Sequence, residues 1–75
     1  MQKFNLTPTQ REVFDFIDDF IDEKGFAPTY REIAEGCGFT SLSRVTQLMK
    51  ALKLRGWIDY LPKQNRSITI LGDKA

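Results

Sequence analysis

Apolar residues recur at helical spacing in three segments of this 75-residue chain and gather into two short runs near its end. The first segment opens with Thr7-Pro8-Thr9-Gln10, where a threonine cap, a proline at the first helical position and a glutamine three residues after the cap favour a helix start. Lys24-Gly25 favours the end of this helix, with Gly25 in the left-handed conformation of a C-terminal cap. We therefore expect a helix over about residues 8–24, whose spacing predicts one buried stripe made of Val13, Phe14, Ile17, Phe20 and Ile21.

A second, shorter helix is expected over about residues 30–37. Thr29 and Glu32 have the spacing of another capping box, and Ile33 and Ala34 would face the core. Gly38 supplies the positive φ that a tight turn between helices requires, and Phe39 after it would plug the core at that corner.

A third helix is expected over about residues 42–55, with Ser41 as its N-cap and Gly56 at its end. Its apolar side would consist of Leu42, Val45, Met49 and Leu52. Leu54 falls on the opposite, polar side, where it either tucks under the following segment or contacts another subunit. Residues 57–61 and 67–71 are β-type runs around a proline-containing turn, which predicts a hairpin, and Trp57 would pack between the third helix and this sheet.

These elements predict an α+β fold: a winged helix-turn-helix, with three helices followed by a two-stranded antiparallel β-hairpin. One domain over residues 1–75 is expected, with the wing at about 57–71. The length allows a modest core, and the hydrophobic fraction of 41% argues against a disordered chain.

The composition excludes several kinds of chemistry. The chain has one cysteine and no histidine, so it can form neither an internal disulfide nor a cysteine-based zinc site, and it lacks the commonest general base. Cys37 is interpreted as a small core residue rather than a redox sensor. No secretory leader and no apolar run of about 20 residues is present. We therefore expect a cytoplasmic protein that is not an enzyme and has no cofactor, metal, membrane or small-molecule partner.

Charge is distributed unevenly along the chain. Residues 1–35 carry four Lys/Arg against eight Asp/Glu, a net charge of −4, whereas residues 36–75 carry seven against two, a net charge of +5. A basic half indicates a polyanionic partner. Four acidic residues share the outer face of the first helix, and we interpret them as a solvated face rather than a metal or acid–base site: Asp15, Asp18, Asp19 and Asp22.

The polar side of the third helix carries residue types that read base edges in the major groove. Gln pairs with adenine, Arg with guanine, and Ser or Thr with either. A similar face could be merely solvated, but the preceding helix and turn favour contact with double-stranded DNA. Lysines on this helix, and basic residues at the hairpin tip, are predicted to grip phosphates, although such tip residues are often only solubilising. The predicted DNA-binding residues are Ser41, Ser43, Arg44, Thr46, Gln47, Lys50, Lys53, Lys63 and Arg66.

A specific set of residues extends over nearly the whole chain at fixed spacing. It includes Leu6-Thr7, Gln10 to Phe14, Ile17, Gly25, Pro28-Thr29, Glu32-Ile33-Ala34, Gly38-Phe39, Ser41, Lys50-Ala51-Leu52, Gly56, Ile58 and Arg66 before Ile68. With these residues the chain resembles the N-terminal DNA-binding domain of the LexA repressors, which have a winged helix-turn-helix. The resemblance implies a bacterial transcriptional repressor whose third helix reads operator half-sites as a dimer.

Two departures from that family affect what the resemblance implies. The family's recognition helix typically starts Ser-x-Asn-Ala with acidic residues one turn later, whereas this chain has Ser41-Leu42-Ser43-Arg44 and then Thr46-Gln47. We therefore expect a base preference different from that of the standard operator. The family's peptidase domain has no counterpart in these 75 residues, so self-cleavage is not expected of them.

Two functions remain open from the sequence. The first is sequence-specific repression of transcription at a promoter, with two copies on a palindromic site, because one small module buries only about 600 to 1,000 Å² of protein surface on DNA. The second is a winged-helix module that docks a protein through Leu54 or the acidic first helix.

Overall fold

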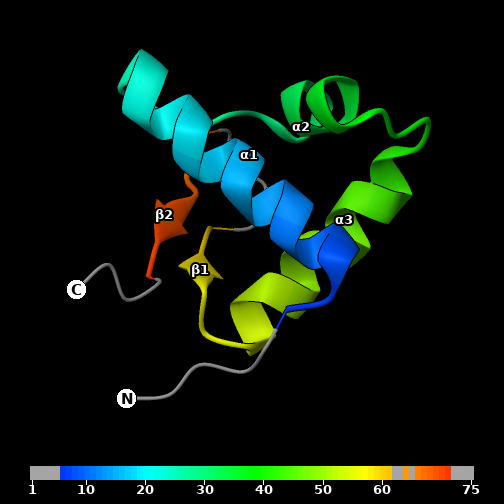
Figure 1. The fold of residues 1–75 in the computed structure, drawn as a ribbon. Coiled ribbons are helices and arrows are strands. Elements are labelled where there is room, and N and C mark those ends of the chain that lie inside the picture. Colours follow the sequence, from blue (N-terminus) through cyan, green and yellow to red (C-terminus); the bar gives the residue numbers. More distant parts are fainter. Residues whose placement is uncertain (1–5, 62–63, 65, 72–75) are drawn as a thin grey trace.

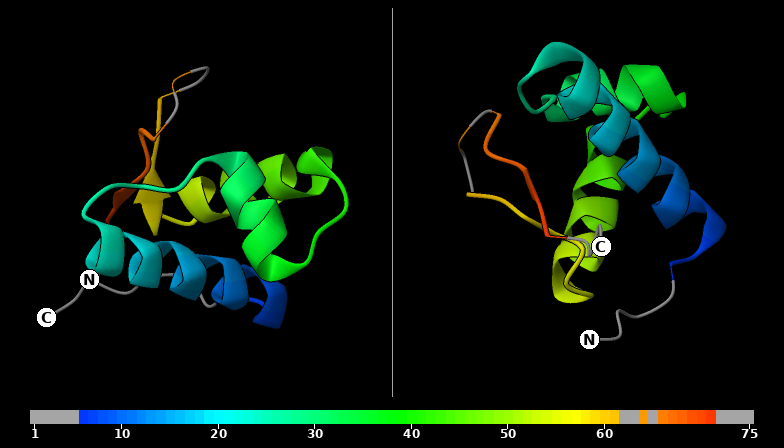
Figure 2. Two further views of the ribbon diagram at one scale, coloured as in Figure 1. Left: turned by 90° about the horizontal axis from the view of Figure 1, so that it is seen from above. Right: turned by 60° about the vertical axis from the view of Figure 1, so that its left-hand side comes forward.

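Three helices precede a short hairpin in the computed structural model, which describes residues 6–61, 64 and 66–71. The elements are α1 (Pro8–Lys24), α2 (Tyr30–Cys37), α3 (Leu42–Leu54), β1 (Ile58–Asp59) and β2 (Thr69–Ile70). The strands pair antiparallel, with Ile58 opposite Ile70. Figures 1 and 2 show the three helices grouped together, with the hairpin beside them. This arrangement confirms the predicted three-helix, one-hairpin fold.

Capping boxes start the first two helices, as the sequence predicted. The Thr7 hydroxyl accepts from the Gln10 amide at 3.2 Å, and the Gln10 side chain accepts from the Thr7 amide at 3.1 Å. Thr29 and Glu32 repeat the exchange at 3.1 and 2.8 Å. Each box satisfies two amides that the helix itself leaves unpaired.

The third helix ends one residue earlier than predicted, at Leu54, with Arg55 as its cap. Gly56 follows with a φ of 85°. The Gly56 amide donates to the Lys53 carbonyl at 3.1 Å, and the Trp57 amide donates to the Leu52 carbonyl at 3.0 Å. These two bonds close a Schellman motif, which turns the chain from α3 into the hairpin.

A single buried cluster joins all three helices to the hairpin. Leu48 belongs to this core although the sequence did not place it there, and Leu42, predicted to be buried, is 44% exposed. A helical side chain leans toward the N-terminus of its helix. Leu42 is the first residue of α3, so it projects beyond the packed turns. The buried apolar residues are Val13, Phe14, Ile17, Ala27, Ile33, Ala34, Val45, Leu48, Met49, Leu52, Ile58 and Ile68.

Phe20 was also predicted in the buried stripe, but it is only partly buried and is not packed against the core. Its ring contacts Phe16 and Phe26 instead, with centroids 5.9 and 5.8 Å apart. A Cβ at Gly36 would overlap the Phe16 ring, so the absence of a side chain there lets α2 approach α1 closely. The stripe of α1 is therefore narrower than predicted, and an aromatic row borders it.

The hairpin pairs over fewer residues than the predicted five on each side. One further backbone bond joins the Leu71 amide to the Trp57 carbonyl at 2.9 Å. Beyond β1 the amide of Tyr60 donates to the Asp59 carboxylate, so a side chain replaces the ladder there. The Trp57 ring packs edge-on against Phe14 of α1, with centroids 5.2 Å apart. No helix among the described residues is long and apolar enough to cross a bilayer.

Candidate nucleic-acid interface

The outward side of α3 presents a polar surface that contains no acidic residue. Ser43, Gln47 and Lys50 are exposed on it, and Arg44 is exposed beside them, while Thr46 is half-buried. The opposite side of the helix is fixed in the core by Val45, Leu48, Met49 and Leu52. Because four buried side chains hold the helix, its polar side chains are presented on a rigid element, as base reading requires.

Two hydroxyl groups predicted to touch DNA make bonds within α3 itself. The Ser41 hydroxyl accepts from the Ser43 amide at 3.1 Å and caps the helix. The Thr46 hydroxyl donates to the Leu42 carbonyl at 3.0 Å, one turn earlier. Both bonds fix the first turn of α3. The DNA contacts of Ser41 and Thr46 stay predictions, and the structure shows in addition that both side chains stabilise the start of α3.

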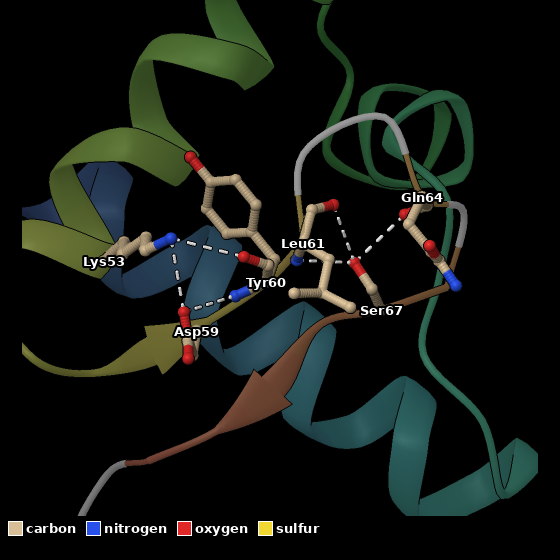
Figure 3. A network of polar contacts seen from close by, with 6 residues as sticks. All are labelled: Lys53, Asp59, Tyr60, Leu61, Gln64 and Ser67. Carbon is tan, nitrogen blue, oxygen red and sulfur yellow. Dashed lines mark hydrogen bonds and ion pairs between the residues drawn. The ribbon is translucent and has the colours of Figure 1, made fainter.

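Lys53 also has partners within the molecule. Its ammonium group lies 3.3 Å from the Asp59 carboxylate, donates to the Tyr60 carbonyl at 3.2 Å and sits 4.7 Å from the centre of the Tyr60 ring. Figure 3 shows this lysine reaching from α3 to the end of β1. The contacts tie the start of the hairpin to the last turn of α3. Both partners, Asp59 and Tyr60, lie beyond the end of α3, where helical spacing no longer indicates which side chains meet, so the sequence did not predict these contacts.

Tyr60 joins the wing to α2 as well. Its ring packs edge-on against Tyr30, with centroids 6.2 Å apart. Burial, together with the neighbouring Tyr60, raises the pKa of Tyr30 to about 12. The Tyr30 ring, which is neutral at physiological pH as any ordinary tyrosine is, packs against the Tyr60 ring of the wing.

A serine closes the wing beyond the strands. The Ser67 hydroxyl accepts from the Leu61 amide at 2.9 Å, and its oxygen lies within donating distance of the carbonyl oxygens of Leu61 and Gln64, at 3.2 and 3.0 Å. Figure 3 shows the hydroxyl between these groups. One side chain thus satisfies backbone groups that the short ladder leaves open.

Arg66 lies against the start of α2. Its guanidinium donates to both oxygens of Glu32, at 3.0 and 3.1 Å, and to the Ala27 carbonyl at 2.9 Å. The same group stacks on the Phe26 ring at 4.7 Å. Its backbone has a φ of 57°, which non-glycine residues seldom adopt. Arg66 therefore clamps the wing to the helix-turn-helix, whereas the sequence predicted a phosphate contact, which remains a prediction.

Glu32 serves two partners at once. Its carboxylate accepts from Arg66 and from the Thr29 amide, and these hydrogen bonds, with that of Arg66 contributing most, hold the pKa of Glu32 below its ordinary value. The sequence indicated only the capping role, because a separation of 34 residues leaves no local signal for the pair. Lys63, the other predicted wing contact, lies outside the described residues.

The acidic side of α1 carries Asp15, Asp19 and Asp22 in exposed positions, and Asp18 is half-buried. Arg11 lies 3.8 Å from Asp15, an exposed pair one turn apart. In the part of the chain that the structure describes, no group of three or more acidic, cysteine or histidine side chains converges as a metal site would require. The four aspartates of α1 therefore form an outer helix face of separate carboxylates, three of them exposed.

Comparisons with known proteins identify the family of the chain. The family model described as LexA DNA binding domain matches residues 2–67. The LexA repressor of Vibrio cholerae is 46% identical over 70 residues, which cover 93% of this chain and 34% of that protein. The LexA repressors of Actinobacillus pleuropneumoniae and Syntrophobacter fumaroxidans are each 40% identical, over 97% and 83% of this chain. The chain spans about a third of the length of these curated relatives. Because the family model matches most of its length, the chain belongs to the LexA DNA-binding domain family.

Proposed function

We propose that this LexA-type domain recognises a specific sequence in double-stranded DNA and represses transcription in a bacterial cytoplasm by occupying a promoter. The observation that carries the proposal is the acid-free, outward side of α3, held rigidly by a buried opposite side. Such a surface can enter a groove lined by phosphates without electrostatic repulsion. The family match supports the same conclusion.

Within this surface we assign base contacts to Ser43, Arg44 and Gln47, which are exposed. Lys50, further along the helix, would contact a phosphate and so position the domain without reading sequence. Arg44 favours guanine and Gln47 favours adenine, because each offers a bidentate match to that base. We therefore propose that this domain prefers a half-site different from that of relatives with other side chains at these positions.

Two copies on a palindromic operator are part of the proposal. A single module of this size makes a small interface with DNA, and pairing two half-sites raises affinity and doubles the sequence read. Half-sites one helical turn apart, about 10 base pairs or a multiple, would match a two-fold arrangement.

Selection of binding sequences from a random duplex pool tests the proposal. We expect an enriched palindrome, and we expect Gln47→Ala or Arg44→Ala to weaken binding to it by about 1–3 kcal/mol and to weaken binding to random DNA less. Arg11→Ala is the matched control, because it removes the same charge from the exposed side of α1. Lys50→Ala should weaken all sequences and reduce the salt slope by about one.

The competing function, a protein-docking module, gives the opposite result. In that case duplex DNA would bind no better than an acidic control polymer at low salt, and no sequence would be enriched. Either finding would contradict the proposed function.

A further inference from the structure

Leu54 is a large apolar side chain placed almost entirely in solvent. It is the last residue of α3 and is 85% exposed, against 44–59% for the other exposed large hydrophobic residues described. This exposure rules out the expectation that it tucks under the wing. A solvent-exposed apolar side chain therefore lies at the last residue of α3, the helix labelled in Figure 1.

The position of Leu54 on the helix coincides with the proposed reading surface. Ser43, Gln47, Lys50 and Leu54 follow one another at intervals of four, three and four residues, so they share one face of α3. The rise of about 1.5 Å per residue places Leu54 about 10 Å beyond Gln47 along the helix axis. Leu54 thus extends the surface that carries the base contacts.

The charges around Leu54 argue against a second copy of the chain as its partner. Lys50 is exposed one turn before Leu54 on the same face, and α3 contains no acidic residue, whereas the neighbouring Lys53 is paired with Asp59. A two-fold contact centred on Leu54 would bring the same cationic side chains of both copies together. A polyanion, in contrast, is attracted by them.

Base edges in the major groove offer a leucine a single kind of apolar group, the 5-methyl group of thymine. We propose that Leu54 packs against such a methyl group and makes the domain select a thymine, an inference that rests on the proposed function. Because Leu54 and Gln47 share one face of α3, the thymine should lie in the same half-site as the base that Gln47 reads.

Uracil in place of thymine tests this directly, because it removes only the methyl group. In the selected duplex each thymine is replaced in turn, and affinity is measured for the wild type, Leu54→Ala and Leu71→Ala. Leu71 is the matched control, an exposed leucine that follows the wing's second strand. We expect uracil at one position to weaken the wild type and Leu71→Ala by roughly three- to fivefold, the effect of one buried methyl group. The same replacement should leave Leu54→Ala unchanged, and that variant should melt with the wild type.

Three results would overturn the inference. Specific binding in which no thymine depends on residue 54 would leave the proposed function standing and remove only the thymine contact. A loss for Leu54→Ala on duplexes with two half-sites, but not on a single half-site, would assign the residue to a contact between copies. Failure to enrich any sequence would refute both proposals.

Discussion

Replacing Gly38 by alanine should destabilise the domain through the backbone alone. Gly38 joins α2 to α3 with φ 80° and ψ 25°, and its amide donates to the Ala34 carbonyl. The Phe39 amide donates to the same carbonyl at 2.8 Å. An alanine must adopt the left-handed conformation to keep these bonds, and L-residues pay about 1–2 kcal/mol for it.

No steric cost should be added to this backbone cost. A Cβ built at Gly38 has no atom within 4 Å, so the side chain of an alanine would enter open space. We therefore expect a loss of about 1–2 kcal/mol in the free energy of unfolding, which corresponds to a fall of about 5–15 °C in the melting temperature for a domain of this size.

Calorimetry and urea unfolding measure both quantities. Gly38→Asn is the control, since asparagine tolerates the left-handed region and should lose less than alanine. Under conditions where all variants are folded, DNA affinity should be equal, because the turn keeps its shape. An alanine variant as stable as the wild type would contradict the positive φ of this turn. A loss well above about 3 kcal/mol would indicate a steric clash, which the open space around the Cβ position does not predict.

Three further predictions concern the core, the clamp and the thiol. Changing the fully buried Ile17 to alanine should lower the free energy of unfolding, measured in urea, by about 2–5 kcal/mol. Glu32→Gln keeps an oxygen for the α2 cap but removes the charge that faces Arg66. Hydrogen bonding lowers the pKa of Glu32 in the folded state, so its charged form stabilises the fold. At pH values above the ordinary pKa of 4.5, the melting temperature of the wild type should therefore be higher than that of Glu32→Gln. This difference should vanish as the pH falls through the lowered pKa of the folded state. A difference that persists in strong acid would contradict the ion pair. Burial raises the pKa of Cys37, so its thiol should react with an aromatic disulfide at pH 8 more slowly than the thiol of the urea-unfolded chain; equal rates would contradict its burial.

The helix starts could be predicted because the chemistry that sets them is local. Thr7 with Gln10 and Thr29 with Glu32 exchange hydrogen bonds over three residues, so both partners of each capping box can be read from a short stretch of sequence. Leu42 shows where periodicity fails. Its spacing matches the core residues of α3, but it is the first residue of that helix and is 44% exposed, which spacing alone does not reveal.

The wing could not be predicted in the same way, because its position depends on pairs that no helix or strand pattern indicates: Lys53 with Tyr60, seven residues apart across the turn into the wing, and Arg66 with Glu32, 34 residues apart. In the sequence, Lys53 and Arg66 are basic residues within or after the third helix, and both were therefore predicted to contact phosphates. The structure shows that Lys53 holds the end of β1 and that Arg66, in a left-handed backbone conformation, holds Glu32 and the Ala27 carbonyl. A loss of DNA affinity on removing either residue would therefore not by itself reveal a phosphate contact, since a displaced wing would also weaken binding.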